Sequence, residues 1–280
     1  MSRPVTWVNG AAQPTVSTCD RGLHFGDGVF ETIACEGHRA RFLSLHLQRL
    51  LDGCARLGIR CGPAAPIRAE IQTVAAEAGR AILKVLVTRG TADARGYTPS
   101  GTEDATRITL RYPWPAQSAN ATGEALAVRT LALRLGENPQ LAGLKHCNRL
   151  EQVLARAECA DRKLAEGILF SSSGHLVSGT FSNVFLVRDS QLLTPRIDRC
   201  GVAGVMRRVI MREARRAGID VEECELAAAQ LQAAQEVFLT NALSGIRPVH
   251  LLDGRELGAG PLTRRLQALI APLLEQPSDE

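Results

Sequence analysis

The pattern of apolar and polar positions alternates between strand and helix character along the first half of the chain. Residues 5–8 and 11–16 flank an Asn-Gly pair, which predicts a hairpin with a tight turn. In 41–57, leucines recur at helical spacing and Gly58 follows, so we predict a helix that ends there. The other elements predicted in this half are strands at 28–35, 81–88 and 107–111 and a helix at 67–78.

The second half alternates in the same way after a stretch rich in Pro, Ser and Asn at 112–123. Such a stretch with little periodicity is typical of a linker. We predict an N-terminal domain over 1–115, a linker over 116–123 and a C-terminal domain over 124–280. Short strands throughout favour an α/β fold of mixed α+β character over a doubly wound sheet. The elements predicted here are strands at 125–133, 167–170, 183–187 and 236–239 and helices at 148–164, 205–217 and 262–274.

Composition limits the class of protein. The 280 residues are 45% hydrophobic and 22% charged, which is close to ordinary globular usage. The 33 Lys and Arg residues are interspersed with 29 Asp and Glu, so no basic stripe predicts nucleic-acid binding. No apolar run approaches the ~20 residues that span a bilayer, and the first residues lack an apolar signal core. We therefore expect a cytoplasmic protein without nucleic-acid or membrane partners.

Eight cysteines are spread along the chain, and no two have the C-x2-C or C-x4-C spacing of zinc or thioredoxin-type sites. Without a secretory signal, most are expected to be reduced and to pack as small apolar residues. The six histidines include no H-x-x-x-H pair. We therefore predict no metal site.

Only three of the 33 basic residues are lysines, which narrows the choice of an amine nucleophile. Lys84 lies within a strand pattern and is expected at a sheet edge or on its solvent side. Lys163 ends a predicted helix, where a cation favours the helix dipole, and is expected at the surface. Lys145 lies at a loop-to-helix junction, which can direct a side chain into a cleft.

Two interpretations of Lys145 remain open on position alone. It can form a structural ion pair with Glu151, six residues further along the chain. It can also be a Schiff-base lysine, whose pKa must be lowered by burial or by a nearby cation. Arg149 and His146 are close enough in sequence to supply that cation.

Three segments could hold a phosphate group. Gly201 and Gly204 precede the predicted helix at 205–217, where backbone N–H groups can bind an anion. Arg49 lies three residues after His46, so both share one helix face. A polar turn at 240–245 follows a predicted strand. Together with one unusual lysine, these donors fit a phosphate-bearing aldehyde cofactor.

These motifs combine into a resemblance that covers about residues 5 to 275. The segment DRGLHFGDGVFET at 20–32 resembles the opening motif of the class IV aminotransferases, the fold type IV pyridoxal-phosphate enzymes. Residues 46–50 resemble their phosphate-arginine helix. Residues 144–152 resemble their Schiff-base segment and are especially similar to that of the family's aminodeoxychorismate lyases. Further similar segments are 87–90, 95–97 and 240–243.

The resemblance implies a two-domain fold of type IV with a pseudo-barrel C-terminal domain, pyridoxal 5'-phosphate between the domains, and a homodimer that completes the site. It implies that Lys145 binds the cofactor covalently and that Arg49 holds the phosphate, aided by backbone N–H groups. The cofactor-binding residues it implies are Arg49, Lys145, Ser178, Asn183, Val205, Met206, Asn241 and Ala242.

Related transaminases grip a substrate carboxylate with the loop that corresponds to 95–97. The resemblance therefore implies Arg95 and Tyr97 as carboxylate contacts. Arg247 is a further candidate, although it can instead serve a turn at Pro248. His24 and Thr32 can touch the substrate or merely pack, and for His46 we favour a structural role.

One position departs from the family's pattern, because Ser178 stands where the family commonly has Glu. That Glu keeps the pyridine nitrogen protonated and makes the ring a strong electron sink. A weaker sink disfavours transamination. It is compatible with a lyase that converts 4-amino-4-deoxychorismate to 4-aminobenzoate and pyruvate in folate biosynthesis, because the product ring becomes aromatic.

In this expected reaction Lys145 is the general base that takes the ring proton and then the acid for the leaving group. The alternative is a D-amino-acid or branched-chain aminotransferase of the same fold. A cofactor-free binding protein on the same scaffold is a third possibility, because fold alone does not determine function.

Overall fold

The computed structural model describes residues 4–92, 95–115, 125–160, 164–258 and 260–275. The chain divides into two compact units, which are described separately. The first unit contains the described residues up to 115 together with Leu144–Asn148 and Glu275. The second unit contains residues 125–143 and Arg149–Leu274. The predicted linker at 116–123 lies outside the described residues, and the predicted domain limits stay a prediction.

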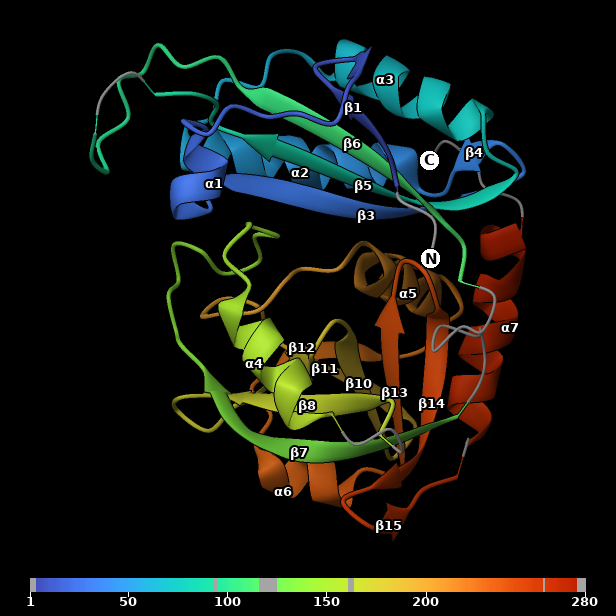
Figure 1. Cartoon of the computed structure of the whole chain (residues 1–280). Helices are drawn as coiled ribbons and strands as arrows, with labels where there is room; N and C mark the ends of the chain where they lie inside the picture. The colour runs from blue at the N-terminus through green and yellow to red at the C-terminus, as the bar shows by residue number, and fades with distance from the viewer. Residues whose placement is uncertain (1–3, 93–94, 116–124, 161–163, 259, 276–280) are drawn as a thin grey trace. The chain divides into compact units, whose positions relative to one another are not determined.

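The first unit is built on an antiparallel sheet with the strand order β2-β1-β6-β5-β3-β4 (Figure 1). Its strands are β1 (Val5–Val8), β2 (Ala11–Ala12), β3 (Gly28–Glu36), β4 (Arg39–Ala40), β5 (Arg80–Thr88) and β6 (Thr106–Pro113). Its helices are α1 (Arg21–Phe25), α2 (Leu43–Leu57) and α3 (Ala64–Ala76).

Helices α2 and α3 pack on one face of this sheet, because both the strands and the helices carry an apolar side. On β5, Leu83 and Val85 are buried, while Lys84 between them is only half-buried and points to the other face. On α2, Leu43 and Leu50 are almost fully buried. Replacing such a leucine by alanine costs about 2–5 kcal/mol of stability.

The second unit is built on a mixed sheet with the strand order β12-β11-β10-β13-β14-β7-β8-β9, and β15 pairs with β14. Strand β9 also lies against β10 and β11, so the sheet curls. The strands are β7 (Leu126–Leu135), β8 (Glu166–Ser171), β9 (Leu176–Gly179), β10 (Asn183–Arg188), β11 (Gln191–Pro195), β12 (Val221–Cys224), β13 (Glu236–Asn241), β14 (Gly245–Leu252) and β15 (Arg255–Glu256). The helices are α4 (Leu150–Glu158), α5 (Val205–Arg216), α6 (Ala228–Ala233) and α7 (Pro261–Glu275).

The core of this sheet contains a pair of stacked aromatic rings. Phe185 on β10 and Phe238 on β13 are directly paired across the strands, and their ring centroids lie 4.9 Å apart. Neither residue is exposed. Among the described helices, none combines the length and the apolar character needed to cross a membrane.

Most of the predicted elements are confirmed, with ends that shift by a few residues. The predicted helix at 148–164 is too long, since α4 ends at Glu158, and Lys163 lies outside the described residues. The predicted turn at Pro248 is wrong, because Pro248 lies within β14 opposite Phe238. Gly, Arg, Pro and His interrupt the apolar pattern of that strand, which hides it in the sequence. The other strands that the pattern did not predict are β9, β11, β12 and the short β4 and β15.

Candidate active site

A buried cluster of charge joins β3 to α2 in the first unit. Glu31 lies on the side of β3 that faces the helices, and it is 1% exposed. Arg49 on α2 donates from Nε to Glu31 Oε1 at 2.7 Å and from Nη2 to Oε2 at 2.5 Å. His46, one turn earlier on the same helix face, contacts Oε2 through Nδ1 at 2.6 Å. This two-point contact fixes the plane of the Arg49 guanidinium.

The protonation of this cluster follows from its burial and its charges. Burial by itself raises the pKa of Glu31, but the charges of Arg49 and His46 and the hydrogen bonds from both residues outweigh it and lower the pKa to about 2. Burial lowers the pKa of His46. Nδ1 of the ring faces the ionised Glu31 carboxylate and donates a hydrogen bond to it. Nε2 of His46 is buried and has no hydrogen-bond partner among the described residues.

Lys145 is held beside the start of β3. The backbone N–H of Phe30 donates to the Lys145 carbonyl at 2.9 Å, and that of Cys147 donates to the Gly28 carbonyl at 2.9 Å. Nζ of Lys145 lies 4.4 Å from the centroid of the Phe30 ring, within cation–π distance. The charge of Lys145 also contributes to the lowered pKa of His46, so the amine and the buried cluster lie near each other.

Lys84 lies on the same face of the sheet, which the sequence pattern did not predict. It stands directly opposite Thr32 across β5 and β3, and its Nζ is 5.2 Å from the Phe30 ring centroid. Of the two positions predicted for Lys84, the sheet edge is wrong, because β5 is an inner strand between β6 and β3. The other, the side away from the core, agrees with its half-buried place on the face opposite the helices. We call Phe30, Thr32, Lys84 and Lys145 the Phe30 cluster. It places two amines beside one ring and one hydroxyl.

The other predicted substrate residues of the first unit gather around α1. Arg95 and Tyr97 are exposed in the connection between β5 and β6. The Tyr97 ring lies 5.3 Å from that of Phe25 on α1. His24 is also exposed on α1, and its Nε2 is 2.6 Å from the carbonyl oxygen of Thr18. The structure therefore places Tyr97 against Phe25 of α1, His24 on the same helix, and Thr32 in the Phe30 cluster.

In the second unit, a glycine opens helix α5. Gly204 is the N-cap residue and no side chain caps the helix, so the N–H groups of Val205 and Met206 form its first turn without a side-chain acceptor. Asn183 supports the loop before it, because its Nδ2 donates to the Val202 carbonyl at 2.9 Å. A Cβ at Gly204 would lie 2.0 Å from Asn183 Oδ1. A side chain at position 204 would therefore force Asn183 to shift.

The turn after β13 is shaped by its own asparagine. Oδ1 of Asn241 accepts hydrogen bonds from the backbone N–H groups of Leu243 and Ser244, both at 2.9 Å. The side chain of Asn241 is therefore engaged in the turn that also contains Ala242. Arg247 is buried in β14 and lines a small cavity together with Asn241 and Glu166.

Glu166 on β8 is a buried carboxylate that the sequence pattern did not indicate. Its carboxylate accepts hydrogen bonds from the N–H and hydroxyl of Thr180 and from the hydroxyl of Ser182. Burial raises its pKa. Glu166 thus holds the segment that leads into Asn183. Ser178, just before this segment, is half-buried and donates from Oγ to the Gly179 carbonyl at 2.8 Å.

Each unit, taken by itself, contains donors that suit part of a phosphate-bearing aldehyde. The first unit contains an amine and a charged, oriented guanidinium. The second contains a glycine-opened helix start, which binds phosphate readily. In the described residues, no group of three or more His, Cys, Asp or Glu side chains could hold a metal ion.

Residues 28–252 match the family described as amino-transferase class IV. The chain belongs to this family. Members of this family depend on pyridoxal phosphate. The resemblance inferred from the motifs and the two-domain fold type IV class are thereby confirmed.

Class IV relatives match the chain over nearly its whole length. An aminodeoxychorismate lyase from Vibrio harveyi is 32% identical over 265 residues, which are 93% of this chain and 97% of that protein. The crystal structure of 4-amino-4-deoxychorismate lyase from Pseudomonas aeruginosa is 41% identical, with a TM-score of 0.92 over 97% of this chain and 100% of that one. The branched-chain amino acid aminotransferase of Escherichia coli is 26% identical, with a TM-score of 0.87 over 98% and 95%.

Proposed function

We propose that this chain is a pyridoxal-phosphate-dependent lyase that converts 4-amino-4-deoxychorismate to 4-aminobenzoate and pyruvate. The observation that carries the proposal is the Phe30 cluster, in which the Lys145 amine lies 4.4 Å from the Phe30 ring beside a second amine, that of Lys84. Similarity to two aminodeoxychorismate lyases at 32% and 41% identity supports the choice of reaction.

Lys145 would bind the aldehyde of the cofactor, and Arg49 would bind its phosphate. Glu31 keeps the guanidinium oriented and neutralises part of its charge. The N–H groups of Val205 and Met206 are further phosphate donors. When bound, pyridoxal phosphate withdraws electrons and so acidifies the C–H bond next to the substrate's amine nitrogen.

Lys145 then performs the proton transfers. Its neutral amine takes the proton from the ring carbon that bears the amino group. The electrons of that C–H bond form the last double bond of the aromatic ring as the neighbouring C–O bond breaks. Protonated Lys145 gives a proton to the departing enolpyruvate, which becomes pyruvate. Lys84 and Arg95 are cations that match the two carboxylates of the substrate.

Ser178 favours a lyase over an aminotransferase. Its hydroxyl is neutral and donates to the Gly179 carbonyl, so it provides no negative charge to stabilise a protonated pyridine nitrogen. Aromatisation supplies driving force for the elimination, whereas a transaminase must store the electron pair on its cofactor. An aminotransferase for D-amino acids or branched-chain amino acids is the second candidate, and similarity to the Escherichia coli enzyme supports it.

One assay separates the two candidates. Pyruvate release from 4-amino-4-deoxychorismate is measured with lactate dehydrogenase, and amino transfer from D-alanine or leucine to 2-oxoglutarate is measured on the same preparation. We expect fast pyruvate release and slow transfer. Faster transfer than pyruvate release would overturn the proposal in favour of the aminotransferase.

The proposal places the protein in the cytoplasm, in folate biosynthesis, as a homodimer. An apolar stripe on α4 supports self-association, because Leu150, Val153 and Leu154 are 77%, 61% and 60% exposed at helical spacing. Sedimentation equilibrium measures this state directly, and a monomer at micromolar concentration would contradict it.

A further inference from the structure

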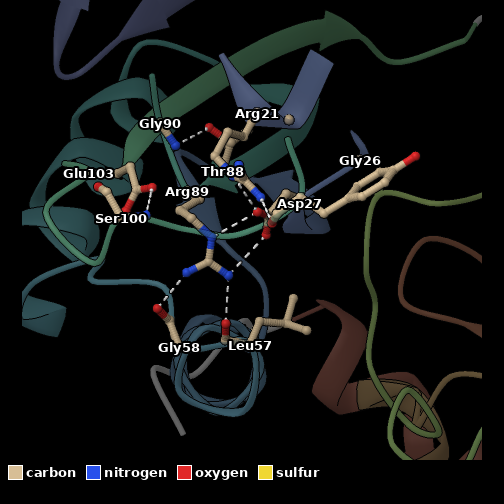
Figure 2. A network of polar contacts seen from close by, with 12 residues as sticks. Arg21, Gly26, Asp27, Leu57, Gly58, Thr88, Arg89, Gly90, Ser100 and Glu103 are labelled. Atoms are coloured by element: carbon tan, nitrogen blue, oxygen red, sulfur yellow. Dashed lines mark hydrogen bonds and ion pairs between the residues drawn. The ribbon is translucent and has the colours of Figure 1, made fainter. Parts of the chain in front are cut away.

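One carboxylate joins two buried arginines at the end of the first unit's sheet (Figure 2). Asp27 Oδ2 accepts from Arg21 Nε at 2.9 Å and from Arg89 Nε at 2.8 Å, and Oδ1 accepts from Arg89 Nη2 at 3.2 Å. Arg21 is 4% exposed and Arg89 is 9% exposed. A buried guanidinium needs a hydrogen-bond partner for each of its donors. The partners of the other Arg21 and Arg89 nitrogens show which segments of the chain this network connects.

Arg89 connects the network to the end of α2. Its Nη1 donates to the Gly58 carbonyl and its Nη2 to the Leu57 carbonyl, both at 2.7 Å (Figure 2). A cation is favourable at a helix C-terminus, where backbone carbonyls lack helical partners. Helix α2 also carries Arg49, so the network is anchored on the helix of the proposed phosphate site.

Arg21 connects the same network to the predicted substrate loop. Its Nη1 donates to the Gly96 carbonyl at 3.1 Å and its Nη2 to the Tyr97 carbonyl at 2.6 Å. The guanidinium carbon lies 4.9 Å from the Phe25 ring, against which Tyr97 also packs. Each nitrogen of the Arg21 guanidinium therefore donates a hydrogen bond, and two of these bonds hold the backbone of the loop at Gly96 and Tyr97.

The position of Arg21 is itself determined by the end of β5. Its backbone N–H donates to the Gly90 carbonyl at 2.8 Å. Asp20 caps α1 by accepting from the Gly22 N–H at 2.7 Å, and it accepts from the Thr88 hydroxyl at 3.0 Å. The backbone of Arg21 is therefore fixed to the end of β5, which limits the conformations by which its side chain can reach the loop.

We propose that Arg21, oriented by Asp27, is a positioning residue that fixes the Gly96–Tyr97 backbone and so presents the Arg95 and Tyr97 side chains to a carboxylate of the substrate. The inference rests on the proposed function, because the substrate must carry that carboxylate. Arg21 acts through the loop and touches no reacting atom. Its loss is expected to weaken binding with little effect on the chemical step.

Two substitutions disturb the contact between the Arg21 side chain and the Gly96–Tyr97 backbone, one at the arginine and one in the loop. Arg21→Lys keeps the charge beside Asp27 but loses the fork that reaches two carbonyls. Gly96→Ala acts from the exposed loop, because its φ of +113° is unfavourable for alanine while its Cβ meets no atom within 4 Å. The controls are Arg60→Gln, whose side chain donates to the Glu103 carbonyl of the same connection, and Gly101→Ala, with φ of +81° and equally open surroundings.

Two readouts are compared on the holoenzyme. We expect Arg21→Lys and Gly96→Ala to raise KM for 4-amino-4-deoxychorismate about tenfold, with kcat within about twofold. We also expect trypsin to cleave after Arg95 about tenfold faster in Arg21→Lys, as mapped by mass spectrometry. Both controls should match the native chain.

Unchanged cleavage after Arg95 in Arg21→Lys would overturn the anchoring, and faster cleavage with an unchanged KM would overturn the substrate role. If Arg21→Lys does not fold, the KM of Gly96→Ala is compared with that of Gly101→Ala. An equal KM in the two variants would overturn the role of the Gly96–Tyr97 backbone in substrate binding. A native chain that releases no pyruvate refutes the proposed function, and the cleavage comparison then still decides whether Arg21 holds the loop.

Discussion

The stability of the first unit should depend on the ionisation of Glu31. Its pKa is lowered from an ordinary 4.5 to about 2 by Arg49 and His46, which outweigh the cost of burial. That difference corresponds to about 3 kcal/mol at pH 7, at 1.36 kcal/mol for each tenfold change in acidity. Glu31→Gln keeps the shape of the side chain but leaves Arg49 without its buried counter-charge. We expect a loss of about 3–5 kcal/mol in the free energy of unfolding at pH 7.

The pH dependence gives a sharper test than the loss itself. Because the folded pKa lies below the unfolded one, the stabilisation is fully present above pH 4.5 and is lost as the pH falls toward 2. The difference in unfolding free energy between the native chain and Glu31→Gln should shrink by about 1 kcal/mol between pH 7 and pH 3.5. Urea denaturation followed by circular dichroism measures both chains at each pH.

Glu77→Gln is the matched control, because Glu77 is an exposed carboxylate that pairs with Arg111 at 2.8 Å in the same unit. An exposed pair of this kind contributes only about 0–1 kcal/mol. If Glu31→Gln costs no more than Glu77→Gln at pH 7, and the difference does not change with pH, the ionised buried cluster is not what stabilises this unit.

Three further predictions concern the proposed site. Lys145→Ala should melt within about 3 °C of the native chain, because the Lys145 side chain is only half-buried. Borohydride treatment should nevertheless fix no phosphopyridoxyl mass on its 144–148 peptide. Lys84→Gln should raise KM for 4-amino-4-deoxychorismate by about 10-fold or more, as expected when a charged hydrogen bond is lost, and steady-state kinetics beside Lys84→Arg check whether charge alone restores it. Gly204→Ala should weaken pyridoxal phosphate binding about tenfold or more in a fluorescence titration, because its Cβ would lie 2.0 Å from Asn183 Oδ1 and shift the start of α5.

The periodicity of apolar residues was sufficient to predict the helices and strands that bury one continuous face. The leucines of α2 and the alternation on β5 predict both elements to within two residues, because each side chain's burial follows from its own position. Strand β14 was not predictable in this way. Its Gly and Pro residues contradict strand propensity, and its Arg and His interrupt the apolar pattern. The strand is stabilised by neighbours on both sides, β13 and β7. Pairing partners of this kind are distant in sequence.

The same distinction separates the site residues that the sequence indicated from those it did not. Lys145 could be singled out because the chain has three lysines and one of them lies at a loop-to-helix junction. Lys84 and Glu31 carry no such signal, since a charged residue within a strand pattern is ordinarily on the solvent side. Only the register, which places Lys84 opposite Thr32, shows that this amine lies beside the Phe30 ring.

Neighbouring residues of β3 therefore serve the two faces of one sheet. Glu31 points to α2, where it fixes Arg49, while Phe30 and Thr32 point to the opposite face, where Lys84 and Lys145 lie. A shift of β3 by one residue against β5 would exchange these faces, burying Thr32 and exposing Glu31. The apolar residues Val29 and Ile33, which flank Glu31 on the helix side, make that shift unfavourable. The same packing that stabilises the core thus determines which side of the sheet carries the amines.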